Sequence, residues 1–266
     1  MITISNKEMK KRLKINNKRA QITIFIILAL AIIVLLVLLF TRNNELTTIF
    51  NTKSPINQIK DCSKEALSEG LELISSQGGS ISPENYYLYE NNKIEYLCYT
   101  EENYKEGIIQ KPLLKQSIEK ELKKYITPKI KGCIDSVKTS LEKKSYIVSY
   151  KDPEISLELI PNNIFATIDL DLKITKDKTE SYKSIKTNIN SNLYKIIMIA
   201  SSILNFEASQ GDSEIMTYMI YYPSLKIEKK IQGDGTKIYI LTDKTSLEKF
   251  MFASKSLVFP PGIIGK

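Results

Sequence analysis

The sequence predicts an α+β protein with one N-terminal transmembrane helix, followed by an extracytoplasmic domain of antiparallel strands with about three core helices. Three observations predict this class. Residues 22–40 form an apolar run that contains no charged side chain. Three later segments repeat apolar residues at three- and four-residue steps, which is typical of amphipathic helices. From residue 145 onward, most segments alternate polar and apolar residues at period two, as half-buried strands do.

The distribution of charge predicts how the apolar helix is oriented. The 266 residues carry a formal charge of +8, of which +6 lies in residues 1–20. By the positive-inside rule, this basic tail is cytoplasmic, and everything after the predicted helix at 21–41 lies outside the cell membrane. The basic excess therefore indicates the lipid bilayer as a partner, and no nucleic-acid partner is expected.

The start of the apolar run carries a second signal. Lys18-Arg19-Ala20-Gln21, followed directly by apolar residues, resembles the class III signal of archaeal type IV pilins. In that family the prepilin peptidase cuts after the small residue, so the resemblance implies processing between Ala20 and Gln21. The fifth residue after this boundary is Phe25, where bacterial-type pilins have Glu. An uncleaved signal anchor is the alternative.

A wider pattern has the same implication for topology. A KRAQ start, a cysteine-bearing segment ending in QGG, and the second cysteine-bearing segment IKGCIDSV follow one another along the chain. This plan is similar to that of a group of uncharacterised single-span surface proteins from small-genome archaea. The resemblance implies a single-pass surface protein and brings no activity with it.

After a polar linker at 42–54, residues 55–142 read as a portion of helices and one hairpin. Apolar spacing predicts a helix from Pro55, with Ser54 as its N-cap, to the Gln77-Gly78-Gly79 stop. Residues 86–90 and 93–99 predict a tyrosine-rich hairpin. Residues 111–142 predict two helices or one bent helix, because Pro128 interrupts the pattern.

Residues 143–266 read as an antiparallel sheet with one packed helix. Strands are predicted at 145–150, 154–160, 164–175, 180–187, 215–222, 225–232, 237–242 and 249–259. The packed helix is predicted at 190–209, where Glu207 falls at the same spacing as the apolar side chains. One outer domain or two are both compatible with this length.

The three cysteines lie in the region predicted to be outside, where disulfides persist. Cys62 and Cys133 each lie on the apolar face of a predicted helix, so we expect them to be bonded, with Cys98 buried and free. Three pairings exist, and spacing alone does not choose among them. A bond that closes this loop is worth about 3–4 kcal/mol in the chain-entropy model.

Catalytic signals are weak throughout the chain. There is no histidine, which excludes histidine-based nucleophilic catalysis and histidine-ligated metals. Asp169 and Asp171 form an Asp-x-Asp pair inside a predicted strand, where an exposed polar face is the simpler interpretation. Bare S-x-x-K spacing occurs three times without the companion motifs that give it meaning, at Ser117/Lys120, Ser140/Lys143 and Ser246/Lys249.

The leading functional hypothesis is therefore a membrane-anchored cell-surface protein with a structural or interaction role. It is not expected to be an enzyme or to hold a cofactor or metal. One alternative is a pilin-like subunit that is processed after Ala20 and assembles with other cell-surface or pilin-like proteins. Another is a membrane-tethered hydrolase or transferase, with Asp169 and Asp171 as its best candidate residues.

Overall fold

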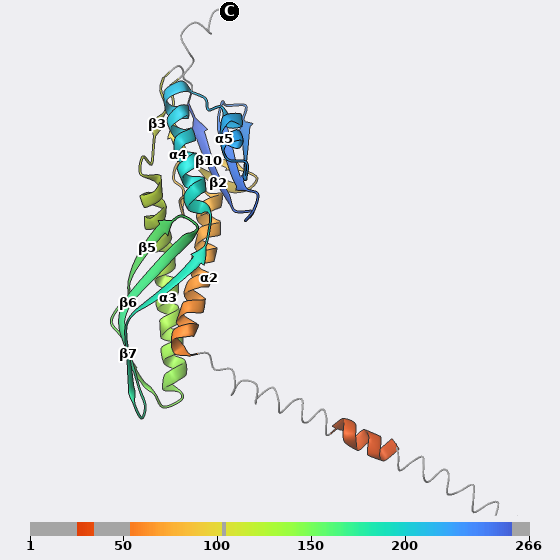
Figure 1. Ribbon diagram of the computed structural model, residues 1–266, viewed down its shortest axis with the longest axis vertical. Coiled ribbons are helices and arrows are strands. Elements are labelled where there is room, and N and C mark those ends of the chain that lie inside the picture. Colours follow the sequence, from red (N-terminus) through yellow and green to blue (C-terminus); the bar gives the residue numbers. More distant parts are fainter. Residues whose placement is uncertain (1–25, 35–53, 103–104, 257–266) are drawn as a thin grey trace, which may run out of the picture. The chain divides into compact units, whose positions relative to one another are not determined.

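The computed structural model describes residues 26–34, 54–102 and 105–256 (Figure 1). The chain divides into two compact units, residues 1–54 and 55–266. In the first unit residues 26–34 form a helix. About 20 residues are needed to cross a bilayer, and no helix among the described residues is long and apolar enough to do so. The predicted fold class included a transmembrane helix, and for the described residues this part of the prediction is wrong. The rest of the predicted span, the tail at 1–20 and most of the linker lie outside the described residues.

The second unit is α+β, and two long helices run through it. Helix α2 (Pro55–Ser76) and helix α3 (Leu114–Glu142) pack against each other and lie side by side in Figure 1. α2 begins at the expected proline. It ends before Gly78 and Gly79, which both adopt positive φ, and the Gly79 amide donates to the Ile74 carbonyl at 2.9 Å. The predicted stop signal is therefore where the helix ends.

Pro128 does not divide α3, contrary to one of the two sequence interpretations. The helix continues through it, and Ile126, Ile130 and Ile134 are buried on both sides of the proline. Proline removes one backbone donor from the helical ladder. The apolar face that continues on either side of it outweighs that local loss.

The smaller sheet has four strands, namely β4 (Ile147–Ser149), β5 (Glu154–Ile160), β6 (Asn163–Thr175) and β7 (Thr179–Asn190). β6 pairs with the other three, always antiparallel. α2 contacts β7, and α3 contacts β4 and β5, so the helix pair covers one face of this sheet. Period-two alternation explains the burial, because alternate β6 residues face the helices and the intervening ones face solvent.

The larger sheet has six strands. Its strands are β1 (Tyr86–Tyr89), β2 (Asn92–Tyr99), β3 (Ile108–Ile109), β8 (Leu225–Ile231), β9 (Lys237–Asp243) and β10 (Lys249–Lys255). Their order is β1-β2-β10-β9-β8, with β3 beside β2. β10 runs parallel to β2, and the other pairs are antiparallel. This sheet combines strands from both portions that the sequence distinguishes at residue 142, so those portions share one compact unit.

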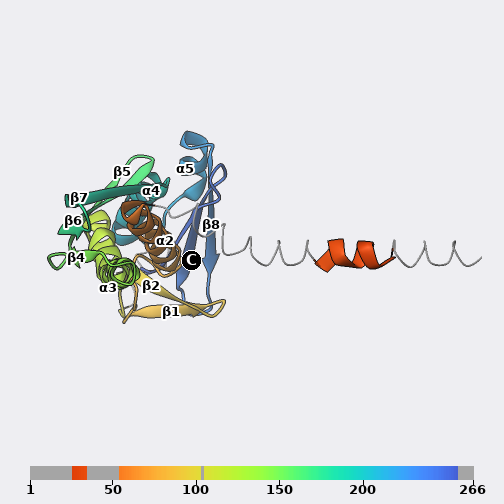
Figure 2. The same cartoon turned by 90° about the horizontal axis from the view of Figure 1, so that it is seen from below.

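Two further helices belong to this end of the unit. Helix α4 (Leu193–Gln210) packs on β10, β2 and β9, and helix α5 (Ile215–Tyr221) packs on β8. Figure 2 shows α5 and β8 on one side of the α2–α3 pair and β5–β7 on the other. Residues 215–222 were expected to be a strand, and this expectation is wrong. Ile215, Tyr218 and Met219 pack on the core at helical spacing, and the Glu214 side chain caps the helix by accepting from the Met216 amide at 2.9 Å.

Gly70 of α2 packs tightly against side chains of α3, which gives a first prediction. A Cβ at this position would lie 2.6 Å from Leu122 Cδ1 and 2.8 Å from Tyr125 Cδ1. Gly70→Ala is therefore expected to lower the free energy of unfolding by about 1–3 kcal/mol, because the added methyl pushes the two helices apart. Urea titration followed by far-ultraviolet circular dichroism measures this change.

Gly132 provides the matched control for that substitution. It is also inside a long helix, but it is exposed, and a Cβ there would have no neighbour within 4 Å. Gly132→Ala is expected to stabilise the protein by about 0.5–1 kcal/mol through helix propensity alone. Equal effects of the two substitutions would show that the Gly70 contact does not determine how closely the helices approach.

Candidate functional site

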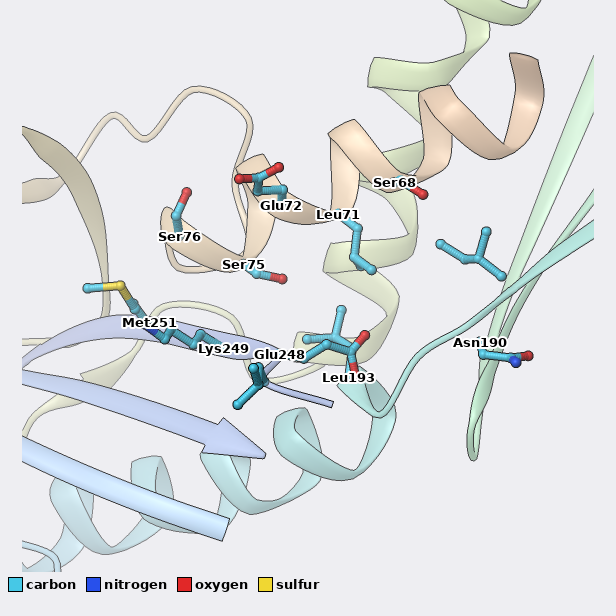
Figure 3. A pocket seen from close by; sticks show the side chains of 12 residues that line it. Ser68, Leu71, Glu72, Ser75, Ser76, Asn190, Leu193, Glu248, Lys249 and Met251 are labelled. Carbon is cyan, nitrogen blue, oxygen red and sulfur yellow. The ribbon is translucent and has the colours of Figure 1, made fainter. Parts of the chain in front are cut away.

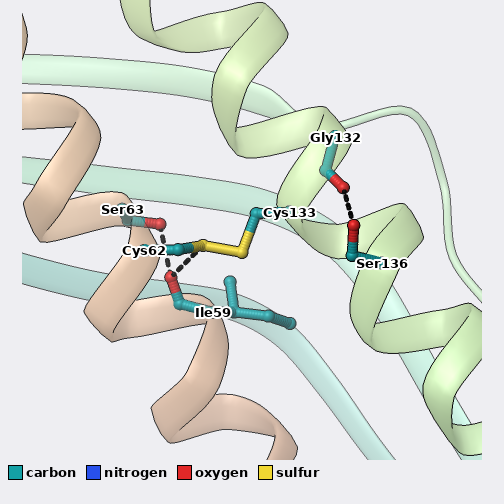
Figure 4. The surroundings of a disulfide bond; sticks show 6 residues. All are labelled: Ile59, Cys62, Ser63, Gly132, Cys133 and Ser136. Carbon is teal, nitrogen blue, oxygen red and sulfur yellow. Dashed lines mark hydrogen bonds between the residues drawn. A yellow bond between two sulfur atoms is a disulfide. The ribbon is translucent and has the colours of Figure 1, made fainter.

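The structure joins the two long helices through a disulfide between Cys62 of α2 and Cys133 of α3 (Figure 4). Their Cα atoms lie 6.5 Å apart, which is within the range that a disulfide bridges. This is the pairing that the sequence predicts. In the other unit, the candidate processing boundary at Ala20 and Gln21 lies outside the described residues.

Cys98 is a free thiol on β2 and is fully buried. Burial raises the pKa of Cys98 to about 11, although hydrogen bonding to Ser254 acts in the opposite direction. The thiolate is the reactive form of cysteine. At neutral pH, Cys98 is therefore an inert core residue and a poor candidate nucleophile.

The Asp-x-Asp pair does not form a site. Asp169 and Asp171 are both exposed on the solvent face of β6. A bulge separates them in the pairing of β6 with β7, and Asp171 itself has a positive φ. Among the described residues, no group of three or more potential ligand side chains is arranged to hold a metal ion. The pair is therefore a solvated part of a sheet surface.

The three S-x-x-K pairs are also dispersed. Ser117 and Lys120 lie on α3, and Ser140 and Lys143 border a shallow hollow near its C-terminal end. Ser246 donates to a Glu248 carboxylate oxygen at 3.0 Å, so its hydroxyl is already engaged. None of these serines is hydrogen-bonded to the lysine of its pair.

The tyrosine-rich hairpin, β1 and β2, is part of the larger sheet. Tyr96 is 6% exposed and lies with Ile94, Ile238 and Ala253 in a small core on one face of the larger sheet. Its hydroxyl lies 2.8 Å from Thr236 Oγ1. Sheet packing therefore accounts for Tyr96.

One candidate site is a cavity of about 480 Å³ between α2, the start of α4 and β10 (Figure 3). Leu71 and Leu193 line it from the two helices, and Lys249 and Glu72 lie at its rim. Its polar groups need no ligand. Glu248 accepts the Asn192 amide at 2.5 Å and so caps α4, while Lys249 and Glu72 are exposed to water. The charged groups of this cavity therefore give no indication of a ligand.

A buried ionic cluster lies where the end of α4 meets the larger sheet. Glu207 of α4 is completely buried, although its spacing groups it with apolar residues. Its two oxygens accept hydrogen bonds from Lys237 Nζ at 3.1 and 3.2 Å, from Ser254 Oγ at 2.8 Å, and from the Tyr239 hydroxyl. Burial, and then the charge of Glu207, raise the pKa of Tyr239, so this phenol stays protonated and donates.

The cluster continues toward the surface through Asp212. Its carboxylate accepts from Lys229 at 2.8 and 3.0 Å and lies 3.3 Å from Lys237 Nζ. Burial acts to raise the pKa of Asp212, but the hydrogen bond from Lys229 and the charge of Lys237 outweigh burial and lower it. Every charge in this cluster is paired within the cluster. We interpret it as structural.

The second candidate site is a hollow of about 480 Å³ between α4 and α5, which we call the α5 hollow. Its lining combines four aromatic rings with hydroxyl groups and one carboxylate; the residues are Ser202, Phe206, Ser213, Glu214, Thr217, Tyr218, Tyr221 and Tyr222. Tyr221 is 76% exposed and Phe206 is 52% exposed, whereas Ser213 is only 1% exposed. The Oγ atom of Ser213 has no hydrogen-bond partner.

The α5 hollow differs from the first cavity because several aromatic rings that line it are exposed. Exposed aromatic rings that gather around a hollow with a few polar groups are typical of a binding site, so the α5 hollow is the stronger candidate. Sequence reasoning missed this site because it assigned 215–222 to a strand, which separates its tyrosines onto two faces. Comparison with known protein families, curated proteins and solved structures finds no match for this chain.

Proposed function

We propose that the folded unit is a non-catalytic interaction domain that works outside the cytoplasm and engages its partner through α5. The single observation that carries the proposal is the exposure of α5. Met216, Ile220 and Tyr221 are 58%, 72% and 76% exposed, and Phe206 of α4 lies exposed beside the α5 hollow. No charged residue occurs from Ile215 to Tyr222. Clustered exposed apolar side chains of this kind mark interaction sites on soluble domains.

The disulfide supports the proposed compartment. Disulfides persist in oxidising surroundings and are rare where thiols are kept reduced. The bond between Cys62 and Cys133 joins the two longest helices of the unit, which is where a structural crosslink is most useful. The crosslink is therefore consistent with a location outside the cytoplasm.

The non-catalytic part of the proposal is supported by how the candidate groups are distributed. Within the described ranges, the Asp-x-Asp pair is exposed on one face of the smaller sheet, and the S-x-x-K pairs do not converge. A catalytic site would bring a nucleophile and a base within hydrogen-bond reach beside a hollow. The α5 hollow instead presents rings and hydroxyls, which suit binding.

Photocrosslinking tests this proposal. The full-length chain carries benzoylphenylalanine in place of Tyr221 and, in a matched control, in place of Ile147, which is 74% exposed on β4. After incubation with envelope material from the source cells and illumination, a discrete adduct is expected at position 221 and not at 147. Absence of an adduct at 221, or the same adducts at both positions, would remove α5 as the binding surface.

A further inference from the structure

The α5 hollow presents an aromatic and nearly uncharged surface. Phe206, Tyr218, Tyr221 and Tyr222 line it, and Glu214 is the one charged residue among its lining side chains. That carboxylate already caps the first turn of α5. Moving a charge out of water costs free energy unless a partner compensates it. The hollow therefore favours an occupant that is apolar and carries no charge.

The chain itself contains such an occupant directly after β10. Residues 257–265, which we call the 257–265 segment, lie outside the described residues and read Leu-Val-Phe-Pro-Pro-Gly-Ile-Ile-Gly. Proline fixes its own φ and biases the residue before it toward extended backbone, so the sequence restricts Phe259 and Pro260 before any contact forms. Proline-rich segments bind grooves lined by aromatic rings because they lose little conformational freedom on binding.

The structure brings the start of this segment to the end of α4 that borders the hollow. β10 and α4 pack together and lie side by side in Figure 1. Lys249, at the start of β10, lines the first cavity together with Leu193, at the start of α4. Toward the other end, Ser254 Oγ donates to Glu207 Oε2 at 2.8 Å. The chain therefore leaves β10 close to Phe206, the α4 residue that precedes Glu207 and lines the α5 hollow.

The length of the chain is sufficient to bring the two prolines into the hollow. An extended chain spans about 3.5 Å per residue, so the six residues from Ser254 to Pro260 reach about 20 Å. Packed helices have axes about 8–10 Å apart, so the space between α4 and α5 lies within this reach. A short tether also gives the segment an effective concentration on the order of millimolar at the hollow. Contacts that are too weak for a free peptide therefore suffice.

We propose that the 257–265 segment docks in the α5 hollow of its own chain, with Pro260 and Pro261 against the aromatic rings, and that an external partner must displace it. This inference rests on the proposed function and adds a regulator to the surface that the function uses. The segment of a second copy has the same sequence but lacks the tether, so the segment of the same chain has the advantage at low protein concentration.

Photocrosslinking of purified full-length protein, without envelope material, tests the docking. With benzoylphenylalanine in place of Tyr221, an adduct is expected within one chain. Trypsin cuts after Lys255 and releases 256–266 as one peptide, so mass spectrometry identifies this adduct. Benzoylphenylalanine in place of Ile220 is the matched control, because Ile220 is 72% exposed on α5 but does not line the hollow. Its yield is expected to be at least about fivefold lower.

A double substitution tests the role of the prolines. Pro260→Ala combined with Pro261→Ala is expected to lower the yield of this adduct at position 221 about tenfold, because alanine restores backbone freedom to the undocked segment. With envelope material present, the same variant should give several times more partner adduct at position 221. Equal yields at positions 220 and 221, an unchanged yield in the double variant, or an adduct that joins two chains overturns the inference.

The outcomes separate this inference from the proposed function. If position 221 forms no adduct within the chain but still crosslinks to an envelope component, the inference fails and the proposed function stands. If the adduct within the chain forms, and no envelope adduct appears even with the double variant, the docking is supported and the proposed function fails. If position 221 gives neither adduct, both fail.

Discussion

Replacement of Glu207 by alanine is expected to lower the free energy of unfolding by about 3–5 kcal/mol, the largest effect that we predict. Glu207 is completely buried and accepts hydrogen bonds from Lys237, Tyr239 and Ser254. Its removal leaves Lys237, whose side chain is only 10% exposed in the intact protein, with the Gly211 carbonyl and Asp212 as its remaining partners. Two buried hydroxyls lose their acceptor at the same time.

A double variant separates the cost of an unpaired charge from the worth of the ion pair. Glu207→Leu combined with Lys237→Met replaces both ions by apolar side chains of similar volume, and such exchanges are often close to neutral. We therefore expect the double variant to be more stable than Glu207→Ala. Urea titration measures both, with tyrosine fluorescence as the signal, because the chain has 15 tyrosines and no tryptophan. A loss below about 1 kcal/mol for Glu207→Ala would show that water reaches the cluster.

The local elements of the fold were largely predictable because their signals lie within a few residues. Pro55 and the Gly78-Gly79 pair set the two ends of α2, as their backbone preferences require. The hairpins are present too, although the first turn uses positive φ at Glu90 and Asn91, one residue earlier than expected. Turn residues predict where a chain reverses more reliably than they predict the exact register of the two strands.

The pairing of β2 with β10 could not be predicted. Tyr96 on β2 is in register with Ala253 on β10, and no local pattern connects positions so far apart. Parallel pairing depends on how intervening elements fold, and here α3, the smaller sheet and α4 all fold between them. The sequence therefore predicted five of the six strands of the larger sheet, all except β3, without predicting their order.

The candidate site was missed for a related reason. Residues 215–222 are rich in Ile, Tyr and Thr, which favour strands, and their helical contacts through Tyr218 and Met219 form only when the core is present. The buried ionic cluster has one signal in the sequence, because Glu207 occupies an apolar position of α4. Its partners Lys237 and Ser254 come from β9 and β10, so the sequence could not name them.

Loss of the disulfide is the second large effect that we expect. Cys62→Ala combined with Cys133→Ala should lower the free energy of unfolding by about 3–4 kcal/mol, because the bond spans 71 residues and restricts the unfolded chain. Removing both cysteines avoids a new free thiol between the helices. Urea titration under non-reducing conditions measures the loss against the parent protein.

Reductant and thiol labelling make this expectation specific to the bond. Dithiothreitol should destabilise the parent protein by the same amount and leave the double variant unchanged, since Cys98 is a free thiol in both. Alkylation of the unfolded, unreduced parent should modify Cys98 alone. Modification of Cys62, or equal sensitivity of both proteins to dithiothreitol, would mean that α2 and α3 are held together by packing around Gly70 and not by the crosslink. The extracytoplasmic location in the proposed function would then lose its main support, because a unit without the bond has no need of oxidising surroundings.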